Sequence, residues 1–508
     1  MRWRRRRRAS WCLLCLSFAG ALAATRWVAQ DCRAEDAPAA PAGADPVEGV
    51  WLGTITAPQG STADIGLEFF RTKRGTLVFK LNFPDMFTYS VPFMIPVEAD
   101  GHGHYAIVPA FDLQLQLADD RLSGTFGKGK LPITLRRGGQ FPAKPDARRY
   151  PAAPAPLWKY NLGSGTWAPP VVAGATVYIG TSAGLFHAVH AGDGSGEWVW
   201  TGANAIDGRA VAGVDTVYVL DTKANLVALD RASGSLRWIT PLHDEKIAGA
   251  PAPDNPTFNH RAATPLLLDG VVYCGSSDGG LYALDASTGA KRWRHEAGAP
   301  VFSGVGLHGA DTLMFGTMDG SAVLLDRWTR KEVLRVRTGG GIVTTPIVAA
   351  GRLIVGSRDY MLYGFNLADG ALAWRFSYWF SWVESTPVLA DGLVYVGASD
   401  YSRVTALDPA TGKARWATPV HGMNWGTPLV TADLVFTGTV SQNIAGTAIH
   451  HIGGIMALDR ASGAVKWQLL AETPPENGFG GYAGSLALAG GSVIAAGFDG
   501  YLVALPAR

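Results

Sequence analysis

Apolar and polar residues alternate in short runs along the chain, and turns rich in glycine separate the runs. The run Phe111–Leu117 alternates strictly, which places Leu113, Leu115 and Leu117 on one face of a strand and both glutamines on the other. Further along, an apolar run of the Val-Tyr-Val-Gly type recurs before a polar turn. Both patterns predict an all-β chain of many short strands.

Residues 47–137 form the first predicted domain, a small antiparallel barrel or sandwich. Its other apolar runs lie at Gly49–Trp51, Leu67–Phe70, Leu77–Leu81 and Ile133–Leu135. The segments Glu48–Thr54 and Leu122–Phe126 resemble a barrel-like module found ahead of some secreted hydrolases, a resemblance that implies a fold and no function. His102 and His104 could form half of a metal site, but their glycine neighbours favour two exposed turn histidines.

From residue 157 to residue 508 one unit recurs at a base interval of about 40 residues, the length of a four-stranded propeller blade. The unit contains proline, an apolar pair, glycine, Val-Tyr-Val-Gly, a polar turn, Leu-Tyr-Ala-Leu-Asp, and Thr-Gly before a tryptophan; Thr264–Trp293 shows it most fully. Leu334 takes the tryptophan position once, and the other units have Trp158, Trp198, Trp238, Trp293, Trp374, Trp416 and Trp467.

The units count to eight when the two ends of the array are joined. The last unit supplies three strands, Ser485–Leu488, Ser492–Ala496 and Tyr501–Leu505, and has no tryptophan strand of its own. Leu157–Tyr160 supplies that strand from the other end, and such closure removes exposed sheet edges. The predicted fold is an eight-bladed β-propeller preceded by the small β domain.

Four stretches carry a resemblance to a known family: Ala228–Trp238, Ala283–Trp293, Ala406–Trp416 and Ala457–Trp467. Their Ala-Leu-Asp-x-x-Thr/Ser-Gly-x-x-x-Trp pattern resembles the tryptophan-docking motif of PQQ-like propellers. That family includes quinoprotein dehydrogenases and the BamB-type scaffold of outer-membrane assembly. The motif is structural, because its Asp and Thr brace a turn while its Trp packs between blades. The resemblance therefore implies the fold and leaves the function open.

A basic segment, an apolar segment and a small-residue cleavage site open the chain, namely Arg2 with Arg4–Arg8, Trp11–Leu22 and Ala21–Ala23. This order predicts a signal peptide over residues 1–23 and export to the periplasm or cell envelope. The apolar segment is shorter than a spanning helix requires, so we expect no transmembrane segment in the mature chain. After cleavage, 38 basic residues stand against 42 acidic ones, which disfavours nucleic acid as a partner.

Two linkers and two cysteines complete the mature chain. Residues 24–46, rich in alanine and proline, are predicted to be a disordered linker, and the proline-rich residues 138–156 a semi-rigid one. Cys32 lies in the first linker and Cys274 in a propeller strand. The sequence therefore predicts a monomer without an intramolecular disulfide.

Four segments depart from the repeat: Pro241–Ala263, Phe376–Glu384, Ser441–Gly454 and Leu469–Ala483. Three of them precede the first strand of a blade, and the other joins a second strand to a third. In an antiparallel blade both kinds of connection emerge on the same side. All four departures are therefore expected on one face of the propeller.

On that face, the residues before each first strand approach the central channel. The repeat would place small residues there, whereas charged and aromatic groups occur, which indicates a ligand site at the channel mouth. The candidates are Trp167, Asp207, Arg209, His260, Arg261, Glu384, Asn424, Trp425 and Tyr482. Two alternatives stay open: a solvated channel that binds nothing, and architectural salt bridges between blades.

Two apparent motifs are products of the repeat. Gly275–Gly279 fits the G-x-S-x-G pattern but joins two strands, whereas a nucleophile elbow joins a strand to a helix. An aspartate also recurs at one turn of several blades. Recurrence at one repeat position favours turn formation over catalysis for Asp278, Asp319, Asp359, Asp400 and Asp499.

The sequence supports three functional hypotheses. The first is a non-catalytic binding or scaffold propeller of the cell envelope, similar to BamB-type proteins, with an envelope protein or small ligand as partner and no cofactor. The second is an oxidoreductase that uses pyrroloquinoline quinone and calcium, and the third an unrelated enzyme or a sugar-binding module. In the second, Asp207, Glu384 and Asn424 would offer oxygen ligands, Arg209 or Arg261 would pair with a carboxylate, and Trp425 would stack. The absence of adjacent cysteines argues against it.

Overall fold

The computed structural model describes residues 45–58, 60, 62–84, 88–107, 112–127, 130–143, 149–243, 263–379, 381–442, 451–475 and 478–508. The predicted signal peptide and nearly all of the predicted linker 24–46 lie outside them. Contacts divide the chain into two compact units, one built mainly on residues 1–145 and one on most of the remainder. Within the described ranges no helix is long and apolar enough to cross a membrane.

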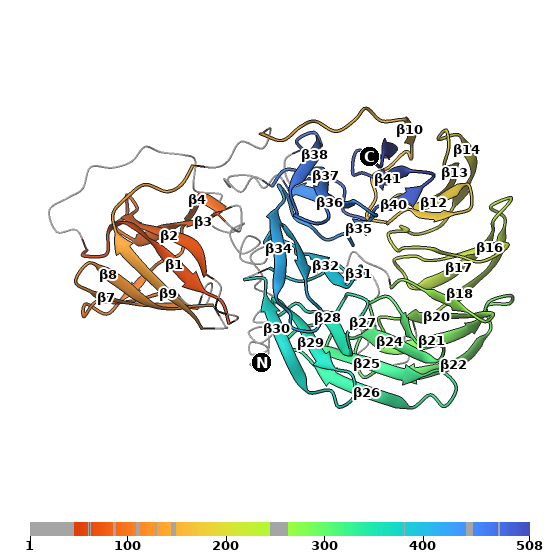
Figure 1. Cartoon of the computed structure of the whole chain (residues 1–508), viewed down its shortest axis with the longest axis horizontal. Helices are drawn as coiled ribbons and strands as arrows, with labels where there is room; N and C mark the ends of the chain where they lie inside the picture. Colours follow the sequence, from red (N-terminus) through yellow and green to blue (C-terminus); the bar gives the residue numbers. More distant parts are fainter. Residues whose placement is uncertain are drawn as a thin grey trace, which may run out of the picture. The chain divides into compact units, whose positions relative to one another are not determined.

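The first unit is one curled antiparallel sheet of nine strands, in the order β4-β3-β2-β1-β9-β8-β7-β6-β5 (Figure 1). Trp51, Phe69 and Phe79 are completely or almost completely buried in it. Leu113 and Leu115 are buried as their alternation predicts. The strands are β1 (Gly49–Thr56), β2 (Thr62–Arg71), β3 (Leu77–Phe83), β4 (Thr88–Phe93), β5 (Glu98–Ala99), β6 (His104–Ile107), β7 (Leu113–Ala118), β8 (Arg121–Phe126) and β9 (Leu131–Arg137).

His102 lies in the connection from β5 to β6, two residues after Asp100, and His104 is the first residue of β6. The Asp100 carboxylate accepts both histidine backbone N–H groups, at 2.7 and 3.1 Å, and the His102 side chain is exposed. This geometry is that of a turn.

The second unit is an eight-bladed propeller, as the sequence predicts (Figure 1). Each blade is built on a four-stranded antiparallel sheet, and in blades 1 to 7 these four strands follow chain order. The first four blades are β11 (Val171–Ala173), β12 (Thr176–Gly180), β13 (Leu185–His190) and β14 (Gly196–Thr201); β15 (Val211–Ala212), β16 (Thr216–Leu220), β17 (Asn225–Asp230) and β18 (Leu236–Pro241); β19 (Leu266–Leu268), β20 (Val271–Gly275), β21 (Gly280–Asp285) and β22 (Lys291–Glu296); β23 (Gly306–His308), β24 (Thr312–Gly316), β25 (Ser321–Asp326) and β26 (Glu332–Arg337).

The last four blades include two irregular ones. Blade 7 carries an extra strand, β39, that pairs with β36, and blade 8 has the order β10-β42-β41-β40. The strands are β27 (Ile347–Ala349), β28 (Arg352–Gly356), β29 (Met361–Asn366) and β30 (Leu372–Ser377); β31 (Val388–Ala390), β32 (Leu393–Gly397), β33 (Arg403–Leu407) and β34 (Ala414–Pro419); β35 (Leu429–Val430), β36 (Leu434–Gln442), β37 (Gly454–Asp459), β38 (Val465–Leu470) and β39 (Phe479–Gly481); β40 (Ala487–Ala489), β41 (Ser492–Ala496), β42 (Tyr501–Pro506) and β10 (Trp158–Asn161).

The ring closes as predicted, because β10 pairs antiparallel with β42. Trp158 lies opposite Ala504, and Tyr160 opposite Leu502. Just before β10, the backbone of Ala153 also donates to the carbonyl of Gln468 in β38. The chain segment ahead of the propeller is therefore attached to blade 7 as well as to blade 8.

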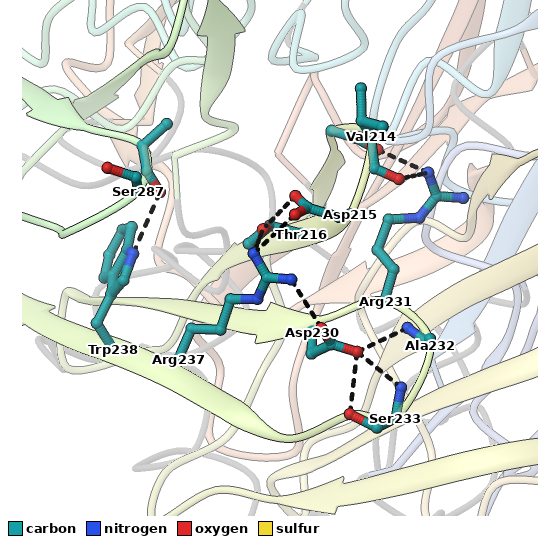
Figure 2. Close-up of polar contacts among 12 residues, drawn as sticks. Val214, Asp215, Thr216, Asp230, Arg231, Ala232, Ser233, Arg237, Trp238 and Ser287 are labelled. Carbon is teal, nitrogen blue, oxygen red and sulfur yellow. Dashed lines mark hydrogen bonds and ion pairs between the residues drawn. The ribbon is translucent and has the colours of Figure 1, made fainter.

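The docking motif holds neighbouring blades together through one tryptophan and one turn. In blade 2 the Asp230 carboxylate accepts the backbone N–H of Ala232 and Ser233 and the Ser233 hydroxyl, at 2.9 to 3.0 Å, and pairs with Arg237 at 2.7 Å (Figure 2). These donors hold the pKa of Asp230 well below its usual range, mainly through Arg237. Trp198 of blade 1 donates its Nε1–H to the carbonyl of Arg231 at 2.9 Å.

The glycine of the docking turn is needed for two reasons. Gly234 has a φ of +70°, and a Cβ there would come within 2.5 Å of the Trp198 ring. The ring therefore lies flat against the turn of the next blade. The same relation recurs between Trp238 and Gly289 and between Trp416 and Gly463.

Candidate functional site

The candidate residues precede the first strands of their blades, which form the inner part of the propeller. First strands of neighbouring blades contact one another, for example β11 with β15 and β27 with β31. Trp167 precedes β11, Asp207 and Arg209 precede β15, Glu384 precedes β31, Asn424 and Trp425 precede β35, and Tyr482 precedes β40. His260 and Arg261 lie outside the described residues, so their placement stays a prediction.

Trp167, which precedes blade 1, and Trp425, which precedes blade 7, contact each other, and the centroids of their side-chain rings are 5.5 Å apart. Phe479 and Phe498 complete an aromatic cluster with them, at 5.2 and 4.7 Å from Trp167. All four rings are partly exposed. Tyr482 lies elsewhere, because its side chain is buried among the core residues of blades 7 and 8. Burial and the charge of Asp499 raise the pKa of Tyr482.

Sequence reasoning missed Phe479 and Phe498. Phe479 lies on β39, within the predicted departure Leu469–Ala483, and pairs with Gln442 of β36. Phe498 lies in the turn between β41 and β42, at a position that the repeat treats as variable. A search of the departing turns for aromatic residues could have found both.

Asp207 is attached to blade 1 although it belongs to blade 2. Its Oδ1 accepts the Ser182 hydroxyl at 2.8 Å and its carboxylate also accepts the backbone N–H of Trp167. Its side chain is buried, and this desolvation raises the pKa of Asp207. Asp207 therefore fixes the backbone that carries one wall of the aromatic cluster.

Arg209 is a charged side chain without a fixed partner. Among the residues that the structure describes, none pairs with its guanidinium. The side chain keeps access to solvent. The surrounding protein atoms partly desolvate the guanidinium, which lowers its pKa. Such a group can bind an anion without first breaking an internal ion pair.

Glu384 joins two blades. Its Oε1 lies 2.8 Å from Nε and 2.7 Å from a terminal nitrogen of Arg358, which belongs to the β28–β29 turn of blade 5. The Arg358 guanidinium also lies over the Trp382 ring, 4.6 Å from its centroid. Sequence reasoning missed Arg358, although it replaces the uncharged Ser277 and Met318 of the equivalent turns. The contact is the blade-to-blade salt bridge of the architectural alternative, so Glu384 has a structural role.

Asn424 and Trp425 attach blade 7 to the β32–β33 turn of blade 6. Trp425 donates its Nε1–H to the Ser399 hydroxyl at 2.6 Å, and the Asn424 backbone N–H donates to the Ala398 and Ser399 carbonyls, both at 3.3 Å. The Asn424 side-chain N–H donates to Thr437 of β36, within blade 7, at 2.6 Å. Asn424 is completely buried. Its Oδ1 lies so close to Gly397 that a Cβ added to Gly397 would be only 2.4 Å from this oxygen. That oxygen accepts no hydrogen bond from any described residue.

The recurring turn aspartates are structural in four blades, as predicted. Each accepts the backbone N–H of the residue two positions further on, at 2.8 to 3.2 Å: Asp278 from Gly280, Asp319 from Ser321, Asp359 from Met361 and Asp499 from Tyr501. A left-handed residue follows the aspartate directly in each of these turns. The prediction of turn chemistry is therefore right for these blades.

For Asp400 the prediction is wrong, because its turn is one residue longer. Gly397 pairs with Val404 in blade 6, whereas Gly356 pairs with Leu362 in blade 5. The left-handed residue of the blade 6 turn is Ser402, at a φ of +48°, and does not directly follow Asp400. The extra residue moves Asp400 out of the capping position.

The shifted Asp400 carboxyl is buried, with 8% of the residue exposed. Burial and the charge of Glu384 raise the pKa of Asp400 to about 6, while the Ser399 hydroxyl at 3.4 Å opposes that rise. An acid with such a pKa changes its charge near neutral pH. The sequence signal that could have found Asp400 is the length of its turn, not its residue type.

The donor set does not fit the calcium site of a quinoprotein. Glu384 is engaged by Arg358, and the Asp207 carboxylate accepts hydrogen bonds from Ser182 and Trp167 of blade 1, so both carboxylates are already bound to other groups. Across the described ranges, no three His, Cys, Asp or Glu side chains lie close enough to hold a metal ion. Cys274 is completely buried in β20, and desolvation raises the pKa of its thiol to about 12.

The ring of eight four-stranded sheets with tryptophan-docking turns defines a PQQ-like β-propeller. The family model described as outer membrane protein assembly factor BamB matches residues 195–303, 277–381 and 378–508. These matches cover more than half of the chain, and the chain belongs to this family.

Similarity to individual proteins is lower. BamB of Bordetella pertussis is 29% identical over 214 residues, which are 39% of this chain and 52% of that protein. BamB of Moranella endobia is 22% identical over 342 residues, 62% and 71% of the two chains. Quinohemoprotein alcohol dehydrogenase ADH IIB of Pseudomonas putida is 34% identical over 136 residues, 22% and 20% of the two chains. The chain spans about half the length of the first BamB relatives that it matches.

Two solved structures have the same fold. The computationally designed Ika8 protein matches with a TM-score of 0.55 and 14% identity, over 69% of this chain and 99% of that one. Quinohemoprotein alcohol dehydrogenase ADHIIG from Pseudomonas putida HK5 matches with a TM-score of 0.52 and 13% identity, over 69% and 76%. At such identities these likenesses concern the fold alone.

Proposed function

We propose that this protein is an exported, non-catalytic binding or scaffold propeller of the cell envelope that assists the assembly of outer-membrane proteins. The observation that carries the proposal is the match to the BamB family over residues 195–508. The polar groups of the repeat supply a further argument, because the docking aspartates and tryptophans hold blades together and are not free for chemistry. The predicted signal peptide over residues 1–23 would place the protein in the periplasm.

The ligand site of this scaffold is proposed at the channel mouth. Trp167 and Trp425 offer partly exposed ring faces, and Arg209 offers a cation that pairs with none of the described residues. Asp207 and Glu384 hold the walls in place through bonds to neighbouring blades. His260 and Arg261 remain candidates for the same mouth.

Two measurements test the scaffold function. Deleting the gene in the source organism should lower the amount of folded β-barrel protein in its outer membrane, and the full-length gene should restore it. The purified mature protein, titrated with pyrroloquinoline quinone and calcium, should show no dye-linked alcohol oxidation. Unchanged outer-membrane proteins in the deletion strain, or quinone-dependent oxidation, would contradict the proposal.

A further inference from the structure

The Asp400 carboxyl is not part of any ion pair among the residues that the structure describes. Within the described part of the chain no Lys, Arg or His side chain forms an ion pair with it, and the Arg358 guanidinium is directed to Glu384 instead. Its one side-chain contact is with the Ser399 hydroxyl, at 3.4 Å. More than nine tenths of the residue is buried, and its Oδ1 accepts no hydrogen bond from another described residue. A buried carboxylate in this state is strongly destabilised unless a partner arrives or a proton is taken up.

Aromatic residues lie next to the turn that carries this carboxyl. Trp425 binds the adjacent Ser399 hydroxyl at 2.6 Å, and the Ser399 backbone N–H donates to the Trp382 carbonyl at 3.1 Å. Tyr360 is close enough that the charge of Asp400 contributes to raising the pKa of its hydroxyl. Trp382 already accepts one guanidinium on its face, that of Arg358. Ring faces next to a carboxylate are the arrangement that binds organic cations.

We propose that Asp400 and the rings beside it form a subsite for an ammonium or guanidinium group of a ligand bound at the channel mouth. This inference rests on the proposed ligand site and names the chemistry that one part of it recognises. The cation would supply a counter-charge that no described residue supplies through an ion pair, and the rings would exclude water from the pair. Lysine or arginine side chains of a polypeptide and free amines share this chemistry.

Proton balance gives the subsite a measurable signature. Near its pKa, Asp400 is partly protonated, so a bound cation would stabilise the carboxylate and release a proton to solvent. Affinity would therefore rise with pH until Asp400 is fully ionised. Among the described residues, the other charged or titratable groups around the turn are Glu384, Arg358, Asp359, Tyr360, Tyr401, Arg403 and His451.

The experiment is calorimetric titration of the mature protein with three probes near pH 6, in buffers that differ in ionisation enthalpy. The probes are agmatine, acetyl-Gly-Arg-Gly-amide and the same peptide with neutral citrulline in place of arginine. The two cations should bind with release of a fraction of a proton, and the citrulline peptide should bind at least about tenfold more weakly. Binding of agmatine alone would identify a free amine as the ligand, and binding of the arginine peptide alone a polypeptide.

Asp400→Asn should weaken cation binding by about tenfold or more and abolish proton release. The matched control is Asp319→Asn, which changes the equivalent turn of blade 4 and should leave both unchanged. Equal binding of the citrulline peptide, undiminished binding by Asp400→Asn, no binding of either cation, or binding of calcium in their place would overturn the inference. Proton release by the unmodified protein tests it independently of how the variant folds. If the cation probes did not bind but deletion of the gene still lowered the amount of folded outer-membrane protein, the subsite would be wrong and the scaffold function would still be supported.

Discussion

A residue's environment, more than its type, determines its chemistry in this propeller. Asp230 and Asp400 have the same side chain, yet four donors lower the pKa of Asp230 and burial beside Glu384 raises the pKa of Asp400. Asp230 therefore ionises without destabilising the fold, whereas ionisation of Asp400 lowers the free energy of unfolding. Asp230 belongs to the docking turn between β17 and β18, whereas Asp400 belongs to the β32–β33 turn, where one extra residue moves it out of the capping position that its equivalents in other blades occupy.

The raised pKa of Asp400 predicts a penalty on folding at neutral pH. Its pKa in the folded state, about 6, exceeds the unfolded value of 3.8, so the folded protein loses stability as pH rises between these values and carries the full penalty above the higher one. Asp400→Asn should therefore raise the free energy of unfolding by roughly 1–3 kcal/mol at pH 7 and by much less near pH 4. Urea denaturation at both pH values measures this.

Asp319→Asn should have the opposite effect on stability. Hydrogen bonds from Thr317 and Ser321 and the charge of Arg337 outweigh desolvation of the carboxyl, so the pKa of Asp319 is lowered. That variant should lose stability at neutral pH, with a smaller loss in acid. If both variants responded to pH alike, the environment assigned to Asp400 would be wrong.

Cys274 should behave as a buried apolar group. Its side chain is inaccessible and its thiol pKa is raised to about 12, so at pH 8 almost none of it is thiolate. In a Cys32→Ser background, a maleimide should label Cys274 slowly in the native mature protein and rapidly in denaturant. Rapid labelling of the native protein would contradict the burial of β20.

At the scale of the element, the docking turn explains why glycine precedes six of the seven tryptophan strands. Gly234→Ala should destabilise through its positive φ and through contact with the Trp198 ring at 2.5 Å. Gly270→Ala is a matched control, because Gly270 has a φ of +69° and no atom within 4 Å of its Cβ position. Thermal and urea denaturation should show that Gly234→Ala costs roughly 1–3 kcal/mol more than the control. Equal costs would mean that the ring contact does not matter.

The elements were largely predictable from the sequence, and the site was not. The strand pattern and the tryptophan positions recur from blade to blade, and the closing segment completes that pattern. Recurrence in the sequence shows what every blade needs in order to fold. The site depends on what differs between blades. Trp167 and Trp425 stand out as departures, but their meeting with Phe479 depends on β39, which has no counterpart in other blades. Asp400 resembles the other turn aspartates until the pairing of β32 with β33 is known.

At the scale of the whole molecule, one short strand closes the ring. β10 supplies the fourth strand of blade 8, and Trp158 packs in a core shared by blades 8 and 1 and donates to the carbonyl of Ala191 at 3.1 Å. Removing β10 would expose the edge of β42 and delete one docking tryptophan. Because no other described segment pairs with that edge, closure should fail cooperatively rather than blade by blade.

Two truncated chains test this closure. A chain that begins at Arg149 keeps β10 and the Ala153 bond to β38, and should melt close to the temperature of the propeller in the mature protein. A chain that begins at Gly163 lacks β10, and should melt at a clearly lower temperature and self-associate through the free β42 edge. Calorimetry gives the melting temperatures and light scattering the mass. Equal melting temperatures for the two chains would show that the propeller is stable as an open array and that β10 does not close it.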